Sequence, residues 1–320
     1  MLQTYPKNSK SKPFIVICGP TASGKSALAL SFAQRYGGHI INADSRQIFQ
    51  DLPILSASPS EEDFQSIPHK LYHILPWESA PFNAALWAEL ASQEIENCAQ
   101  QNKVPIVVGG TGFYIQTLLE GIPNIPTPPR YHTLIHKLLA LPGFSALAHH
   151  FLKSWDPNLT FHKNNTAALM RAVSIAISTG KKPSSLKNAP KRYFTQRPSI
   201  LIAITPQKHL LDHRIAQRAN IMFESGVRDE VRSFTKHKRY QPNLIGFQEC
   251  LDVDKNLISE KKAIERIVIS TRQYAKRQLT FARGQMRPDI IWPHIFDQSQ
   301  WEKINEEILK YWCHRGGLNS

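Results

Sequence analysis

Between residues 14 and 121, short apolar runs alternate with longer segments in which apolar residues recur every three or four positions. The short runs are bounded by turn-forming residues, as buried parallel strands are, whereas the longer segments suit helices. We therefore expect strands at 14–18, 39–43 and 104–108, and helices over 27–33, over 84–101 and from about 114. This alternation predicts an α/β fold with a doubly wound parallel sheet.

The pattern changes at a cluster of prolines, at positions 123, 126, 128 and 129. From there to about residue 196 helical patterns dominate, at 134–141, 144–155 and 166–179. A β-branched strand pattern returns at 198–204, followed by helices over 209–224, ended by Gly226, and over 260–283. The sequence therefore predicts a core formed by residues 1–121 and 197–320, with a helical insertion at 122–196.

Positive charge is concentrated in this insertion. It holds ten Lys and Arg residues against one acid, Asp156, in a chain of 320 residues with a net charge of +14. An excess of this size favours a polyanionic partner such as nucleic acid over simple solubility. No apolar run approaches the ~20 residues of a membrane span, and the four cysteines show neither a CxxC pair nor zinc-ligand spacing. We expect a cytoplasmic protein with no membrane segment and no structural metal.

The most specific motif follows the first strand. It fits the phosphate-binding loop, in which Gly, any four residues and Gly-Lys-Ser/Thr lie between a strand and a helix. The glycines let successive backbone N–H groups face an anion, aided by the helix N-terminus. Lys25 can reach a terminal phosphate, and the Ser26 hydroxyl can bind Mg²⁺. The predicted phosphate site is Gly19, Pro20, Thr21, Ala22, Ser23, Gly24, Lys25 and Ser26.

Two more polar residues follow predicted strands. Asp44 comes directly after the strand at 39–43, at the sheet edge where ligands bind. Its carboxylate can accept a proton, ligate Mg²⁺ through water or cap a helix over 45–50. The strand at 104–108 runs into Gly109, Gly110 and Thr111, where motor and switch NTPases usually carry a Mg²⁺-binding Asp. Thr111 can either bind reacting groups or cap the next helix.

Two predicted helices carry basic faces. Arg214 and Arg218 are four residues apart, so they share one face and can clamp phosphate; a solvated surface is the alternative. On the helix at 260–283, Arg272, Lys276 and Arg283 fall within about 40° of one another. Since no acid lies between residues 265 and 289, a contact with a phosphate backbone is the better interpretation of this second face.

Taken together, six segments resemble the tRNA dimethylallyltransferases, the bacterial tRNA isopentenyltransferase family. They are GPTASGKS at 19–26, NADSRQIFQDL at 42–52, VVGGTGFYIQTLLEG at 107–121, LMRAVSIAISTGKKPS at 169–184, LIGFQE at 244–249 and TRQYAKRQLTFAR at 271–283. The first segment is shared with many kinases, but the later motifs in this order are specific. The resemblance implies transfer of a dimethylallyl group from its diphosphate to the exocyclic amine of the adenosine just 3′ of the anticodon in tRNA.

The resemblance also implies roles for individual residues. The phosphate loop and Arg218 would hold the diphosphate of dimethylallyl diphosphate, with Mg²⁺ on Ser26. Asp44 would be the general base, Thr111 would help bind the reacting groups, and Arg214 would clamp the diphosphate. A monomer is expected to bind the anticodon stem-loop through Asp44, Ser45, Arg46, Gln47, Thr111, Arg171, Gly246, Phe247, Gln248, Arg272, Lys276, Arg277, Gln278 and Arg283.

Some positions depart from the family pattern, and three alternatives stay open. The departures are Arg46, Ser58, Ser174 and Phe247. They leave open which residues contact the target base and the prenyl donor. A phosphate-loop kinase, or an enzyme that prenylates free AMP, would not require the basic insertion. A non-catalytic RNA-binding protein would not require an intact phosphate loop together with Asp44 and Thr111.

Overall fold

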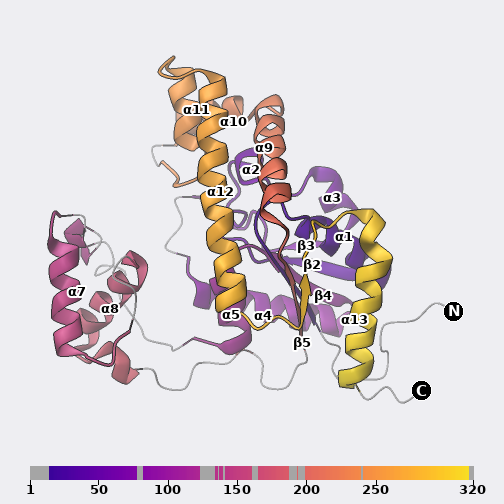
Figure 1. The fold of residues 1–320 in the computed structure, drawn as a ribbon, viewed down its shortest axis with the longest axis horizontal. Helices are drawn as coiled ribbons and strands as arrows, with labels where there is room; N and C mark the ends of the chain where they lie inside the picture. The colour runs from indigo at the N-terminus through magenta and orange to yellow at the C-terminus, as the bar shows by residue number, and fades with distance from the viewer. Residues whose placement is uncertain are drawn as a thin grey trace. The chain divides into compact units, whose positions relative to one another are not determined.

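The computed structural model describes residues 14–77, 82–122, 134–135, 137–139, 141–160, 165–186, 193, 199–238 and 241–316 (Figure 1). The chain forms two compact units, Met1–Leu118 with Phe194–Ser320, and Leu119–Tyr193. The insertion expected at 122–196 overlaps the second unit. No helix in the described ranges is long and apolar enough to cross a membrane.

The first unit is built on a six-stranded parallel sheet in the order β3-β2-β4-β1-β5-β6. β1 lies between β4 and β5, with Ile17 opposite Val108 on one side and Ile202 on the other. All five residues of β1 are buried, as strands of a covered parallel sheet are. The strands are β1 (Phe14–Cys18), β2 (Gly38–Asn42), β3 (His69–Lys70), β4 (Val104–Gly109), β5 (Ser199–Ile204) and β6 (Ile290–Trp292).

One face of the sheet packs against α1 (Lys25–Tyr36) and α13 (Trp301–Gly316), which lie next to each other (Figure 1). Ile15 and Ile17 of β1 share a buried cluster with Phe32 of α1 and Ile304 of α13. The Phe32 ring meets the Trp301 ring edge-on, with centroids 4.9 Å apart. This packing holds α1 at the carboxyl end of β1, where the phosphate loop begins.

Further helices cover the strands and extend beyond them. α4 (Ala84–Gln100) packs on β2 and β4, and α5 (Gly112–Glu120) starts just after β4. The long α12 (Glu260–Gly284) runs beside α9 (Lys208–Glu224), joined by a buried apolar cluster. A second cluster joins α2 (Pro53–Ser56), α10 (Val227–His237) and α11 (Phe247–Asp254). α3 (Glu61–Ser66) begins with a capping box between Ser60 and Asp63.

The second unit contains α7 (Phe144–Trp155), α8 (Thr166–Thr179) and a 3₁₀ turn, η1 (Pro183–Leu186). Its core includes Leu152 of α7 and Leu169 of α8. Asp156, the one acid of the predicted insertion, is fully buried and accepts hydrogen bonds from the Ser184 backbone N–H, at 2.8 Å, and hydroxyl. This carboxylate therefore holds the turn at Ser184 and is shielded from solvent.

The predicted α/β sheet is confirmed, with strand and helix boundaries within two or three residues of those expected. The alternative in which Asp44 caps a helix over 45–50 is wrong. Residues 45–48 form a turn in which Gln47 N donates to Asp44 O at 3.2 Å, and Phe49 then pairs with Leu75. Of the helix expected at 134–141, residues 134–135 and 137–139 are helical, residue 141 lies in a bend, and residues 136 and 140 lie outside the described residues.

Candidate active site

The phosphate loop connects β1 to α1 and packs against the segment that follows β6. Gly24 has a φ of +88°, and a Cβ added to it would come within 2.4 Å of the Phe296 carbonyl oxygen. The Phe296 N–H donates to the Ser23 carbonyl at 3.1 Å. Only glycine accommodates both the left-handed backbone and this close approach. Lys25 Nζ donates to the Pro20 carbonyl at 3.3 Å, which holds the ammonium against the loop.

Asp44 lies in the turn after β2, and its backbone is fixed by the buried side chain of Asn42. Asn42 Oδ1 accepts from the Asp44 N–H at 2.7 Å, while Asn42 Nδ2 donates to the carbonyls of Asp44 and Leu71, each at 3.0 Å. Asp44 Oδ1 accepts from the Arg46 N–H at 3.0 Å. The carboxylate therefore has a defined orientation before any ligand binds.

The Gly-Gly-Thr turn after β4 packs directly on the Asp44 turn. The Thr111 N–H donates to the Ala43 carbonyl at 3.1 Å, and Thr111 Oγ1 accepts from the Ser45 N–H at 2.9 Å. A Cβ on Gly109 would lie 2.1 Å from the Ala43 carbonyl group. Thr111 thus uses its hydroxyl to join two turns, and glycine at 109 permits their contact.

Gln278 of α12 joins this turn to the phosphate loop. Its side chain is 8% exposed. Its Oε1 accepts from the Thr21 N–H at 2.9 Å, and its Nε2 donates to the Gly110 carbonyl at 3.0 Å. Thr21 is held a second time, by Arg218 of α9, which donates to its hydroxyl. One amide therefore sets the spacing between the two loops.

These loops surround a cavity of about 720 Å³, within the range of small-molecule sites. One part of its lining is polar and charged, and the rest is apolar and comes from α2, α9, α12 and the segment before α11. The polar part includes Thr21, Lys25, Ser26, Asp44, Arg214 and Arg218. The apolar part includes Leu55, Ile215, Ala219, Ile221, Met222, Leu244, Ile245 and Ile267.

The charged groups of the cavity perturb one another. Burial lowers the pKa of Lys25 to about 8, the Asp44 carboxylate opposes the shift and Arg218 adds to it. Burial also lowers the pKa of Arg218, again against the influence of Asp44. The pKa of Tyr274 is raised, first by burial and then by Asp44, so this phenol stays neutral. A single carboxylate therefore faces two cations and a neutral hydroxyl.

The residues predicted to bind RNA are distributed unevenly. Arg46, Gln47 and Arg277 line the cavity with Asp44. Ser45 is fixed on Thr111, as described above. Lys276 and Arg283 are exposed on α12, whereas Arg272 forms an ion pair with Asp212 of α9 at 3.5 Å. The basic face of α12 therefore lies beside an acidic residue of α9, which the sequence of α12 alone does not reveal.

Further along the chain, Phe247 is 2% exposed and meets Phe234 edge-on, so its side chain is part of the core. Gln248 is exposed and donates to Asp252 at 2.7 Å, and Gly246 is buried against Leu55. The side-chain contact expected from Phe247 is therefore not available on this surface. Arg171 is exposed on α8 of the second unit.

Two of the departures from the family pattern have local partners. Ser58 forms a hydrogen bond with Ser56 at 3.0 Å. Ser174 is buried in the second unit and donates to the Met170 carbonyl at 2.7 Å. Sequence reasoning missed Asn42 and Tyr274 as site residues. Asn42 stands two residues before Asp44, a spacing typical of side chains that hydrogen-bond to turns.

Comparison with known proteins identifies the family. The sequence pattern of IPPT, the IPP transferase family, matches residues 47–285. A tRNA dimethylallyltransferase from Zymomonas mobilis is 35% identical over 320 residues, covering 95% of this chain and 97% of that protein. The corresponding protein from Geobacillus thermodenitrificans is 33% identical over 309 residues, covering 94% and 96%.

Two solved structures are also similar to this chain. The tRNA delta(2)-isopentenylpyrophosphate transferase of Staphylococcus epidermidis has a TM-score of 0.65 and 32% identity, covering 93% of this chain and all of that one. A eukaryotic dimethylallyltransferase acting on tRNA has a TM-score of 0.75 and 27% identity, covering 93% of this chain and 78% of that one. The family pattern begins three residues after Asp44, but the full-length relatives also span the phosphate loop. The chain belongs to the IPP transferase family.

Proposed function

We propose that the protein transfers a dimethylallyl group from dimethylallyl diphosphate to the N6 amine of an adenosine in tRNA, releasing diphosphate. The names of its relatives support this reaction. The observation that carries it is the composition of one cavity, which combines a phosphate loop, a single carboxylate and an apolar wall. The phosphate loop suits a diphosphate, the carboxylate suits an amine that loses a proton, and the apolar wall suits a short hydrocarbon chain.

The donor is proposed to bind with its diphosphate on the phosphate loop. Lys25, Arg214 and Arg218 line this part of the cavity and supply positive charge. Backbone N–H groups at the start of α1 add partial positive charge. The apolar residues of α9 and α12 would cover the five-carbon chain, which gains free energy by leaving water. The allylic carbon would then lie between the two regions, on the side of Asp44.

In the reaction, the N6 lone pair forms a bond to the allylic carbon as the bond from that carbon to the diphosphate oxygen breaks. The diphosphate leaves with the electron pair, and N6 loses a proton. Asp44 is proposed to accept that proton, because Asn42 fixes its backbone, the Arg46 N–H orients its carboxylate, and Lys25 and Arg218 lie close by. The same cations stabilise the negative charge that develops on the leaving group. Thr111 is proposed to help bind the reacting groups.

Mg²⁺ is proposed to accompany the diphosphate. Within the described ranges, no group of three or more His, Cys, Asp or Glu side chains could hold a metal by itself. Ser26 is exposed at the N-terminus of α1 and lines the cavity. A single hydroxyl fits an ion that keeps several waters and takes its other ligands from phosphate. The ion would neutralise charge on the diphosphate, and Ser26 would hold it.

The acceptor is proposed to be the adenosine just 3′ of the anticodon, turned out of its stack into the cavity. Such a base costs a few kcal/mol to unstack, which phosphate contacts elsewhere can offset. Lys276, Arg277 and Arg283 are exposed on α12 and suit those contacts. The basic helices of the second unit are proposed to bind the same stem-loop. A monomeric state and a cytoplasmic location remain predictions from the sequence.

Incubating the protein with labelled dimethylallyl diphosphate, Mg²⁺ and either tRNA, AMP or no acceptor tests the proposal. We expect label to enter tRNA alone. Absence of label from tRNA would refute the proposal. Label in AMP would favour prenylation of a free nucleotide. In a parallel incubation with ATP and no RNA, release of phosphate would favour a kinase.

A further inference from the structure

The wall of the cavity formed by α2 has an unusual backbone. Leu55, Ser56 and Ala57 line the cavity, on or directly after a helix of only four residues. The residues on either side of that helix, Leu52 and Ala57, have φ values of +60° and +49°. This left-handed conformation is unfavourable for residues with a Cβ. Such a segment persists only when contacts from elsewhere hold it.

Glu230 of α10 supplies the contact at the start of α2. One carboxylate oxygen accepts from the Ile54 N–H at 2.7 Å, and the other accepts from the Leu55 N–H at 2.9 Å. Both bonds are charge-assisted and therefore stronger than bonds between neutral groups. Burial raises the pKa of Glu230, and the two N–H donors oppose that shift.

Gln47 supplies the contact at the other end. Its Nε2 donates to the Ala57 carbonyl at 2.6 Å and to the Ser56 carbonyl at 3.3 Å. Two side chains thus hold the N–H groups at one end of α2 and the carbonyls at the other. Gln47 itself lines the cavity, whereas Glu230 is not among the lining residues. Glu230 can therefore act on a ligand in the cavity through α2.

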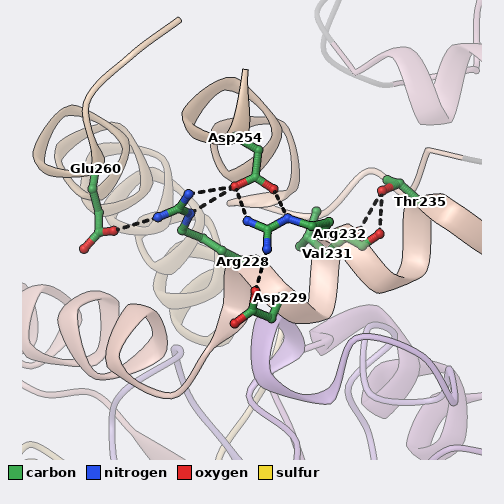
Figure 2. Close-up of polar contacts among 7 residues, drawn as sticks. All are labelled: Arg228, Asp229, Val231, Arg232, Thr235, Asp254 and Glu260. Atoms are coloured by element: carbon green, nitrogen blue, oxygen red, sulfur yellow. Dashed lines mark hydrogen bonds and ion pairs between the residues drawn. The ribbon is translucent and has the colours of Figure 1, made fainter. Parts of the chain in front are cut away.

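The helix that carries Glu230 is itself held by ion pairs from two of its arginines (Figure 2). Arg228 and Arg232 of α10 converge on Asp254 of α11, each with a guanidinium nitrogen 2.9 Å from Oδ1. Arg228 also contacts Glu260, at the start of α12, at 3.4 Å. Val231 of α10 packs in the buried cluster with α2 and α11. The position of Glu230 is thus defined by α11 and α12.

We propose that Glu230 is a positioning residue, which sets the place of the α2 wall in the substrate cavity. The consequence for catalysis rests on the proposed function. The bidentate contact with two N–H groups requires a carboxylate. In Glu230→Gln the amide keeps one acceptor, but its NH₂ group faces the second N–H. One charge-assisted hydrogen bond is then lost, the one that remains joins neutral groups, and the wall is no longer held in a single position.

The test compares Glu230→Gln with Glu224→Gln, which makes the same change at an exposed residue of α9. We expect kcat/KM for dimethylallyl diphosphate to fall at least about tenfold in Glu230→Gln, the factor that one lost charged hydrogen bond represents. Glu224→Gln should match the wild type. In hydrogen exchange, amides of residues 52–58 should exchange faster in Glu230→Gln, while amides of α12 should not change.

Unchanged exchange at 52–58 would overturn the contact itself. Faster exchange with kcat/KM within twofold of wild type, measured where both proteins are folded, would overturn the positioning role. The two readouts also separate this inference from the proposed reaction. A wild-type protein that places no label in tRNA would refute the reaction, while hydrogen exchange would still test the hold of Glu230 on α2.

Discussion

Gln278→Leu should weaken both the fold and the binding of diphosphate. The substitution keeps the approximate volume of the side chain. It removes the amide that bonds both the Thr21 N–H and the Gly110 carbonyl. A buried polar group left without a partner costs about 1–3 kcal/mol. Because Thr21 and Gly110 are half-buried, water can partly replace the amide, so we expect a total of about 2–4 kcal/mol. For a protein of this size that corresponds to a fall in Tm of roughly 3–6 °C.

The matched control is Gln273→Leu, at an exposed position of the same helix, where we expect a change within about 0.5 kcal/mol. Thermal denaturation measures stability, and titration with inorganic diphosphate and Mg²⁺ measures the phosphate loop. Diphosphate affinity should fall in Gln278→Leu alone. Equal Tm and equal affinity in the two variants would refute this reasoning. Loss of tRNA affinity with unchanged diphosphate affinity would instead make Gln278 an RNA contact.

Three further predictions concern the charged groups. Asp44→Asn should lower kcat by about 10²–10⁴, the usual contribution of a general base, with tRNA affinity in a binding assay nearly unchanged. Because the pKa of Lys25 is about 8, its ammonium is present below that pH and lost above it. The Kd of diphosphate should therefore rise as pH passes through 8, and Lys25→Arg should remove that pH dependence. Neutralising Lys276 and Arg283 should weaken tRNA binding and flatten its dependence on salt by roughly one unit of slope per lost contact; an unchanged slope would exclude α12 from the interface.

Much of the sheet could be predicted because its central strands are read from local sequence. β1 is a continuous apolar run between turn signals, and its boundaries were expected to the residue. β3 and β6 have only two and three residues at the edges of the sheet. Such short segments carry no periodic signal, and only pairing with a neighbour makes them strands.

The site residues likewise divide into those that local sequence predicts and those that it does not. Asp44 and Thr111 could be predicted because each follows a recognisable strand closely, and Lys25 because it belongs to the phosphate-loop motif between β1 and α1. The contacts of Gln278 and Glu230 could not be predicted, since their partners lie 168 or more residues away in sequence. For Gln278, helical periodicity predicted a basic face of the helix but gave no reason to place an amide between two loops.

The close contact between the turns after β2 and β4 explains why this phosphate loop is unlike that of a motor or switch NTPase. An Asp at 109, directly after the apolar part of β4, would force its Cβ to within 2.1 Å of the Ala43 backbone. At 110 it would meet the Gln278 amide, also at 2.1 Å. Backbone packing therefore excludes an acid at 109, and one at 110 would require Gln278 to move. The carboxylate of the site instead follows the neighbouring strand β2, as Asp44. From there it faces the cavity beside Lys25 and Arg218, where a base can take a proton from an amine while the cations hold a leaving diphosphate.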